Sequence, residues 1–451
     1  MTPMTPMTHR LAIASLLSAC IAPSFAAPPS RACTVSIAND DQLAAQDTFS
    51  TLAPGATVCI APGVYKRPLV IANAHGTATE PLTFAVHPAG VAEMTDGLVL
   101  RAVAYVKVSG LAVRLDPKKG PVSAVTLDVG THHSSVSGLT VDGAFVGIAL
   151  GSSEGASGVG NEIEGNLVRA SWNTGIGVSP LSDGSYAEPN RIRGNRVSGS
   201  GGHGIEVTDA NAIAIENNVV TSSGTGVNSV QQGGYSGIHL YASARSGTGS
   251  PHGIRCAYNR IVSNTVTGTL ERPGNAMCRD GSGSGRCADG NGIQVDQWCS
   301  GNNVVSNQVS GNAGDGISIY GGTGNSVHGN VVSGNNQQVA RATFLPGPAE
   351  IAVSAVNMPA GSAADNAVYD NTATTTVHRI PAFYLSPNAG DNRIGPNNRW
   401  YWAKSAEPGW TWSPVVLGKK GYTSGKDVDQ ATGTSANVVE ESASGARAAK
   451  P

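Results

Sequence analysis

A short unit of sequence, Gly-Ile-x-Val or a close variant, returns along the middle of the chain. It restricts the fold more than any other feature, because regular return at short spacing is typical of stacked coils. The unit begins at Gly147, Gly175, Gly204, Gly237, Gly292 and Gly316, with a variant at Glu350. A second unit, Asn-x-(Val/Ile/Leu)-x-x-Asn, alternates with it at residues 161–166, 190–195, 259–264, 302–307, 325–330, 366–371 and 392–397.

The spacing of these units predicts the architecture. The shortest full period, from Asn307 to Asn330, is 23 residues, which suits one solenoid coil of three short strands. Successive strand side chains point to opposite faces, so Ile and Val would point inward and the residue between them outward. Repeated Asn residues would hydrogen-bond from coil to coil, and Gly would permit tight corners. We expect an all-β, right-handed parallel β-helix with long loop insertions on one face.

The composition excludes several other classes of protein. The chain has 58 Gly, which disfavours a helical bundle, and only 13% charged residues, which disfavours disorder. The formal net charge of -2 gives no general attraction for nucleic acid, so no nucleic-acid partner is expected. After the N-terminus, no apolar stretch reaches the roughly 18 residues that a membrane span needs.

The N-terminal segment has the features of an export signal. Residues 11–22 are apolar, and residues 24–26 (Ser-Phe-Ala) fit a cleavage site, so residues 1–26 are predicted to be a signal peptide. Residues 17–20 (Leu-Ser-Ala-Cys) also fit a lipoprotein signal, in which Cys20 would carry lipid. Simple cleavage leaves six of the seven cysteines, an even number that suits an oxidising compartment. We therefore favour a secreted or periplasmic protein without a lipid anchor.

The rest of the chain divides by pattern into three segments. Residues 33–400 are predicted to form the β-helix. Residues 401–424 are rich in Trp and are predicted to cap the last coils, since an open solenoid end exposes strand edges. Residues 425–451 are small and polar and are predicted to be a disordered tail.

The six remaining cysteines are expected to form three disulfide bridges. Cys256 lies three residues before Asn259 and Cys299 three before Asn302, so the two should occupy matching positions in adjacent coils. The predicted pairs are Cys256 with Cys299, Cys278 with Cys287, and Cys33 with Cys59.

Long insertions gather beside one strand of the middle coils. The spacing from the Asn of one coil to the Gly-Ile unit of the next is 9 residues at its shortest and stretches to 19, 28 and 20 residues. Insertions in a solenoid often mark the binding face. These carry several arginines, including Arg245 and Arg279, whose planar guanidinium groups suit carboxylates. An acidic polysaccharide is therefore a reasonable partner.

The outward positions of the repeat indicate a candidate active face. Small residues occupy these positions at both ends of the series, whereas the middle coils carry polar and titratable side chains, which suggests a groove across the middle coils. The candidates are Glu206, His239 and Gln294 in one column, Tyr241, Asp296 and Tyr320 two residues later, and His203, Asn291 and Asp315 just before the same strands.

Two chemistries fit these side chains. β-Elimination from a uronic acid needs a base, an acid and charge stabilisation. His239 could be the base and Tyr241 the acid, with Glu206 orienting His239 or binding a cation. The candidates for substrate binding are Gln294, Tyr320, His203, Asp315, Arg245 and Arg279. Hydrolysis would instead use Glu206 and Asp296 as paired carboxylates.

The first coils resemble those of a known group of proteins. Residues 54–65, 76–84 and 105–113 resemble the opening coils of the pectin-lyase-like superfamily, particularly its chondroitinase B and alginate lyase type. The resemblance covers residues 33–400 and implies a β-helix and a polysaccharide lyase. Several lyases of this group use a Lys or Arg base with calcium. This chain departs from that pattern, since no Lys lies between Lys119 and Lys404 and no dense acidic cluster is visible.

These observations predict a polysaccharide lyase that acts on an acidic exopolysaccharide. A glycoside hydrolase, a carbon-5 epimerase and a non-catalytic carbohydrate-binding β-helix are the alternatives. No cofactor is required by the sequence, although Ca²⁺ is possible, and we expect a monomer.

Overall fold

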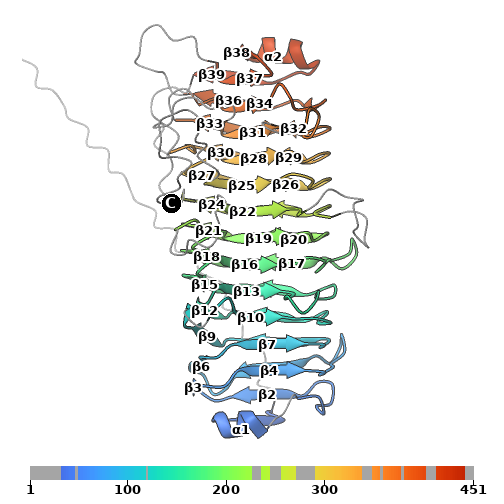
Figure 1. The fold of residues 1–451 in the computed structure, drawn as a ribbon, viewed down its shortest axis with the longest axis vertical. Coiled ribbons are helices and arrows are strands. Elements are labelled where there is room, and N and C mark those ends of the chain that lie inside the picture. The colour runs from blue at the N-terminus through green and yellow to red at the C-terminus, as the bar shows by residue number, and fades with distance from the viewer. Residues whose placement is uncertain are drawn as a thin grey trace, which may run out of the picture. The chain divides into compact units, whose positions relative to one another are not determined.

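The structure is a computed structural model that describes residues 32–45, 49–117, 120–225, 235–243, 255–270, 290–337, 348–355, 359–376, 380–402 and 413–441. The chain divides into two units, Met1–Ala32 and Cys33–Pro451, and every described strand lies in the second. That unit is a right-handed parallel β-helix, in which each coil contributes one strand to each of three 13-stranded sheets. Figure 1 shows the coils stacked from β2 to β39.

Sheet A contains the first strand of each coil. Its strands are β1 (Val35–Ile37), β2 (Thr57–Ile60), β5 (Leu82–Val86), β8 (Val106–Ser109), β11 (Ser135–Ser137), β14 (Glu162–Glu164), β17 (Asn190–Arg193), β20 (Ile213–Glu216), β23 (Arg260–Val262), β26 (Asn303–Val305), β29 (Ser326–His328), β32 (Ala367–Tyr369) and β35 (Arg393–Ile394).

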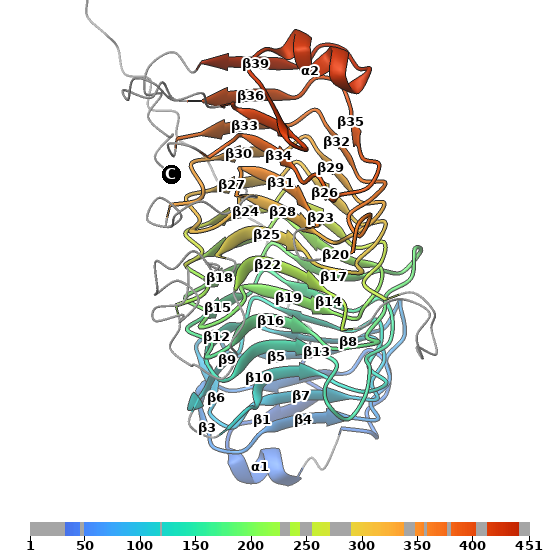
Figure 2. The ribbon, with the colours of Figure 1, turned by 45° about the horizontal axis from the view of Figure 1, so that its top comes forward.

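Sheet B follows one corner later, and Figure 2 shows its strands beside those of sheet C. Its strands are β3 (Gly63–Tyr65), β6 (Ala92–Met94), β9 (Ala112–Leu115), β12 (Thr140–Gly143), β15 (Leu167–Arg169), β18 (Arg196–Ser198), β21 (Val219–Thr221), β24 (Thr265–Thr267), β27 (Gln308–Ser310), β30 (Val331–Ser333), β33 (Thr372–Thr375), β36 (Arg399–Trp402) and β39 (Val438–Glu441).

Sheet C contains the strands that carry the Gly-Ile-x-Val unit. Its strands are β4 (Leu69–Ala72), β7 (Leu98–Arg101), β10 (Ser123–Leu127), β13 (Val146–Leu150), β16 (Thr174–Val178), β19 (Ile205–Thr208), β22 (Ser236–Tyr241), β25 (Asn291–Val295), β28 (Ile317–Tyr320), β31 (Ile351–Ser354), β34 (Phe383–Leu385), β37 (Val415–Leu417) and β38 (Lys420–Tyr422). Strand β38 runs antiparallel to β37.

A ladder of buried Asn side chains fixes the register between coils, as the sequence predicts. Each Asn Oδ1 accepts a hydrogen bond from the backbone N–H of the Asn one coil earlier, at 2.8–3.2 Å. The ladder runs through Asn166, Asn195, Asn218, Asn264, Asn307, Asn330, Asn371, Asn398 and Asn437. Because these backbone groups are buried at the corner between sheets A and B, leaving them unsatisfied would be costly.

The structure also contains two of the predicted disulfides. Cys33 bridges Cys59, and Cys256 bridges Cys299 with a Cα–Cα distance of 4.7 Å, which confirms the predicted register. The pair Cys278 and Cys287 lies outside the described residues. Disulfides persist mainly in oxidising compartments, so both bridges fit a secreted or periplasmic protein. In the part of the chain that is described, no helix is long and apolar enough to cross a membrane.

The chain end differs from the sequence prediction. The coil pattern continues past residue 400, because β36 and β39 extend sheet B. Residues 425–441, expected to be disordered, form helix α2 (Gly425–Thr432) and strand β39. The polar composition of this segment gave no sign of the two contacts that hold it in place. Val428 is fully buried, and Asn437 ends the Asn ladder. At the other end of the stack, helix α1 (Asp40–Ala45) precedes the first full coil.

Two tryptophans at the start of the Trp-rich segment lie in or beside the core. Trp400 is fully buried in the core, 5.7 Å from the ring of Phe383, and Trp402 packs partly buried beside the core. Trp410 and Trp412 lie outside the described residues. The last coil is followed by β38 and α2.

The glycines of the repeat have a different role from the one expected. They lie in or next to the strands of sheet C rather than at tight corners, and a Cβ there would clash with the next coil. At Gly175 it would lie 2.3 Å from Val197 Cγ1 and 2.6 Å from the carbonyl oxygen of Gly204. Left-handed φ values occur instead just before the ladder residues, at Gly165, Gly194, Asn217, Ser263, Ser306, Gly329, Asp370 and Asn397.

We expect Gly175→Ala to lower the midpoint of thermal unfolding, at a cost of about 1–3 kcal/mol, because a backbone carbonyl oxygen blocks the added methyl group. Gly177→Ala is the matched control in the same strand, since a Cβ there would first meet Val146 Cγ1 at an ordinary 3.5 Å. Circular dichroism of both variants measures the difference. Equal midpoints for the two would contradict the close-approach explanation.

Candidate active site

The outward column of sheet C has the register that the sequence predicts. Gly177 pairs with Glu206, Glu206 with His239, and His239 with Gln294. Within β22, Ile238 and Leu240 are fully buried in the core, so His239 and Tyr241 lie on the opposite face. The same alternation in β19 and β25 brings side chains from three coils to one place.

His239 is held between two carboxylates. Its Nε2 lies 3.3 Å from Asp296 Oδ2, and its Nδ1 lies 4.0 Å from Glu206 Oε1. The Tyr241 ring stacks beside it with ring centroids 5.9 Å apart. His239 is only 7% exposed, whereas the side chains of Glu206 and Asp296 keep 23% and 17% exposure. The structure therefore brings four sequence candidates into one cluster, here called the His239 cluster: Glu206, His239, Tyr241 and Asp296.

His203 lies behind this cluster as a neutral imidazole. Its ring stacks on that of His239 with centroids 4.4 Å apart, and its Nδ1 accepts a hydrogen bond from the backbone N–H of Ser236 at 3.0 Å. Burial lowers the pKa of His203 to about 4, although the nearby Glu206 carboxylate opposes that shift. Since Nδ1 is an acceptor, the single proton must lie on Nε2, which faces Glu206 Oε1 at 3.8 Å.

The same geometry tests whether the site suits a metal ion. Ligand atoms of His203, Glu206 and His239 all lie within 4.8 Å of one another. His203 could bind a metal only through Nε2, but the N–H of Ser236 keeps the proton on that atom. Calcium, which the sequence left possible, prefers oxygen ligands, and two of these three groups are imidazoles. The donor set therefore does not fit calcium, and the Nδ1 lone pair of His203 is engaged by the Ser236 N–H.

Two other predicted binding residues, Gln294 and Asp315, are hydrogen-bonded within the protein. Gln294 is 4% exposed, and its Oε1 accepts hydrogen bonds from Ser236 Oγ and Asn291 Nδ2. The Asp315 carboxylate accepts a hydrogen bond from the backbone N–H of Ala349, so it braces a neighbouring turn. Tyr320 lies half-buried in β28 opposite Ser354. Arg245 and Arg279 lie outside the described residues.

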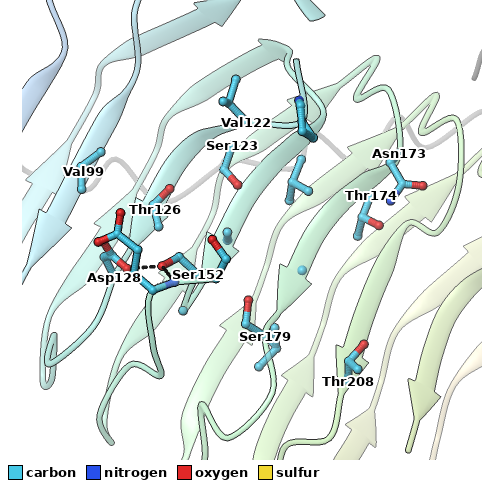
Figure 3. Close-up of a pocket in the computed structure, with 18 of the residues that line it drawn as sticks. Val99, Val122, Ser123, Thr126, Asp128, Ser152, Asn173, Thr174, Ser179 and Thr208 are labelled. Carbon is cyan, nitrogen blue, oxygen red and sulfur yellow. Dashed lines mark hydrogen bonds between the residues drawn. The ribbon is translucent and has the colours of Figure 1, made fainter. Parts of the chain in front are cut away.

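A groove of about 740 Å³ lies on the same face but extends away from the middle coils. It begins at Glu206 and Thr208 and crosses β16, β13 and β10 to Arg101 at the end of β7. The small residues Ala149 and Gly177, outward positions at one end of the repeat series and outside the expected middle-coil groove, line it. Figure 3 shows hydroxyl-bearing side chains along it, among them Ser123, Thr126, Ser152, Thr174, Ser179 and Thr208.

The far end of the groove holds an ion-pair cluster that the sequence did not suggest. Arg101 Nη2 lies 2.7 Å from Asp128 Oδ2 and 3.0 Å from Glu154 Oε2. Burial raises the pKa of the Asp128 carboxyl, but hydrogen bonds from Ser152, the Val129 N–H and Arg101 outweigh it and lower the pKa overall. The Gly-Ile unit is missing from β7 and β10, so the repeat gave no signal in these coils.

Comparison with known proteins supports the fold. Residues 84–240 match the model of a family described as periplasmic copper-binding protein (NosD), which is less than half of the chain. No curated protein sequence matches. Among solved structures, the Dettilon tailspike protein is 15% identical over 84% of this chain and 64% of its own, with a TM-score of 0.55.

Two further structures belong to carbohydrate enzymes. The A-module of the mannuronan C-5 epimerase AlgE6 from Azotobacter vinelandii is 13% identical, over 89% of this chain and 93% of its own, with a TM-score of 0.51. An alginate lyase from Paenibacillus sp. is 18% identical, over 67% of this chain and 95% of its own, with a TM-score of 0.47. At such identities the likeness to the tailspike protein and the epimerase shows the right-handed β-helix fold.

The protonation of His203 can be measured directly. We expect ¹H–¹⁵N spectra to show the Nε2–H tautomer, with His203 neutral down to a pH of about 4. The unfolded chain binds a proton on this side chain below a pH of about 6.5, so stability should fall as pH drops from 6.5 toward 4.

His203→Gln is the matched variant, because its amide oxygen can accept the Ser236 N–H but cannot titrate. Its free energy of unfolding should fall less steeply as the pH drops over the same window. The two slopes should differ by at most about 1.4 kcal/mol per pH unit. Parallel slopes for the two proteins would show that His203 is not a buried neutral group.

Proposed function

We propose that this protein is a polysaccharide-cleaving enzyme. It would bind its substrate along the groove on sheet C and cleave it beside the His239 cluster. The observation that carries the proposal is that His239 lies between the Glu206 and Asp296 carboxylates, with Glu206 also lining the end of the groove. Paired acid and base groups at the end of a polar groove are what glycan cleavage requires. A mannuronan epimerase with this fold makes a polysaccharide a natural substrate class for the scaffold.

The spacing of the two carboxylates is compatible with hydrolysis. Their contacts with the two nitrogens of one imidazole ring limit the distance between Glu206 Oε1 and Asp296 Oδ2 to at most about 9.5 Å. Inverting glycosidases hold their carboxyl groups roughly 6.5–9.5 Å apart, which leaves room for the attacking water. Side chains separated by two coils would thus meet one glycosidic bond.

Each side chain would then have a separate role. Glu206 lines the groove and would donate its proton to the leaving oxygen of the glycosidic bond. Asp296 lies beside His239 Nε2, whose proton would stabilise the carboxylate in the ionised form that a general base needs. Thr174 Oγ1 is hydrogen-bonded to Glu206 Oε2 at 3.0 Å and would orient that side chain toward the groove.

β-Elimination from a uronic acid is the second candidate, and the pairing of His239 with Tyr241 favours it. Burial and then the carboxylates of Asp296, Asp209 and Glu206 raise the pKa of Tyr241. The phenol therefore stays protonated at neutral pH and could serve as the acid, with His239 as the base. A uronate would also need a cation to bind it, for which Arg245 and Arg279 are the sequence candidates.

Removing either carboxylate should abolish most of the activity. We expect Glu206→Gln and Asp296→Asn each to lower kcat by about 10²–10⁴ without unfolding the protein, because each removes an acid or base from the transition state. Reducing ends and the absorbance of unsaturated uronate would be followed on a panel of bacterial exopolysaccharides and uronans. Glu164→Gln, a charge removal in sheet A, is the control and should leave kcat unchanged.

Tyr241→Phe distinguishes the two chemistries. Hydrolysis predicts reducing ends without absorbance and a small effect of this substitution, whereas elimination predicts absorbance and a large loss. His239→Ala should impair both. Saturable binding with no product from any glycan would reject catalysis and leave a carbohydrate-binding protein.

A further inference from the structure

We infer that the groove on sheet C accepts a glycan bearing free amino groups rather than uronates. The inference rests on the proposed function, because it names the substrate class of the same groove. It follows from the charges that line the groove, and it differs from the acidic polymer that the sequence suggested.

The groove is lined by an excess of carboxylates. Among the described residues that line it, Arg101 is the one cation, and the acids other than the proposed proton donor Glu206 are Asp96, Asp128 and Glu154. A concave site lined by charges of one sign focuses its potential, which attracts ligands of opposite charge and repels those of like charge. A uronan would carry repeated negative charges into this field, whereas each free amino group would carry a positive charge.

Arg101 is already committed to the protein. Its Nε donates a hydrogen bond to Asp128 Oδ2 at 2.8 Å, and its Nη2 lies within 3.0 Å of both Asp128 and Glu154. Asp128 is only 1% exposed, so removing this guanidinium from it would leave a buried carboxylate without its cation. One guanidinium shared by two carboxylates leaves a negative charge, and the exposed member is Glu154, whose side chain is 61% exposed.

The other lining groups suit the remainder of such a sugar. Hydroxyl groups of Ser123, Thr126, Ser152 and Ser179 face the groove and can pair with sugar hydroxyls. Ammonium groups carry three donors each and match carboxylate acceptors along the groove. The four coil steps from β7 to β19, at about 4.8 Å each, allow several consecutive sugars to lie along the groove.

The test compares ligands that differ only in charge. The full chain carrying Asp296→Asn, which prevents turnover, would be titrated calorimetrically with glucosamine hexamer, N-acetylglucosamine hexamer and galacturonate hexamer. We expect the glucosamine hexamer to bind most tightly. Its affinity should fall between about 0.01 M and about 1 M salt, as the Debye length shrinks from about 30 Å to about 3 Å.

Glu154→Gln tests the carboxylate that the inference relies on most. It should weaken binding of the glucosamine hexamer about 1.4- to five-fold, the range for one exposed charge pair, and leave the acetylated hexamer unaffected. Glu164→Gln in sheet A removes the same charge from another face and should change neither affinity.

Each outcome separates this inference from the proposed function. Tighter binding of the galacturonate hexamer, equal binding of the two hexosamine hexamers, or affinity independent of salt would overturn the inference while leaving a glycan-cleaving groove intact. If no glycan binds and the variants at Glu206 and Asp296 show no loss of activity, the proposed function itself fails.

Discussion

The hydrogen bond from one buried Asn to the Asn of the next coil is the interaction on which the rest of the structure depends. It satisfies backbone groups at a buried corner and holds successive coils in one register, from Asn166 to Asn437. Fixed register makes residues at equal positions in the repeat neighbours in space. Glu206, His239 and Gln294 lie far apart in sequence and yet lie side by side in sheet C.

Close packing between coils follows from that register and explains the repeat itself. The glycines of sheet C let the carbonyl oxygen of the next coil and a core Val approach to distances that no Cβ would allow. On the outward face of the sheet, the small side chain of Ala149 and the missing side chain of Gly177 leave space for the groove. Small residues of sheet C thus allow close packing between coils on one side of the sheet and make room for the groove on the other.

Burial sets the chemistry of the candidate site. His239 is nearly closed to solvent, and the Ser236 N–H fixes the proton of the buried His203 on Nε2. The neutral His203 imidazole, whose Nδ1 accepts the Ser236 N–H, disfavours metal binding through that ring, although the donor atoms lie close together.

The sequence by itself determined the coil register, the outward column and two disulfides, because a repeat places its equivalent positions at a fixed spacing wherever it recurs. It also predicted correctly that His239, Tyr241, Glu206 and Asp296 lie close together. Only the tertiary structure decided where the groove lies, that Arg101 pairs with Asp128, that Gln294 and Asp315 are committed to neighbouring groups, and that residues 425–441 are ordered. These features depend on contacts between positions outside the repeat and on how deeply each polar group is buried, neither of which a periodic pattern encodes.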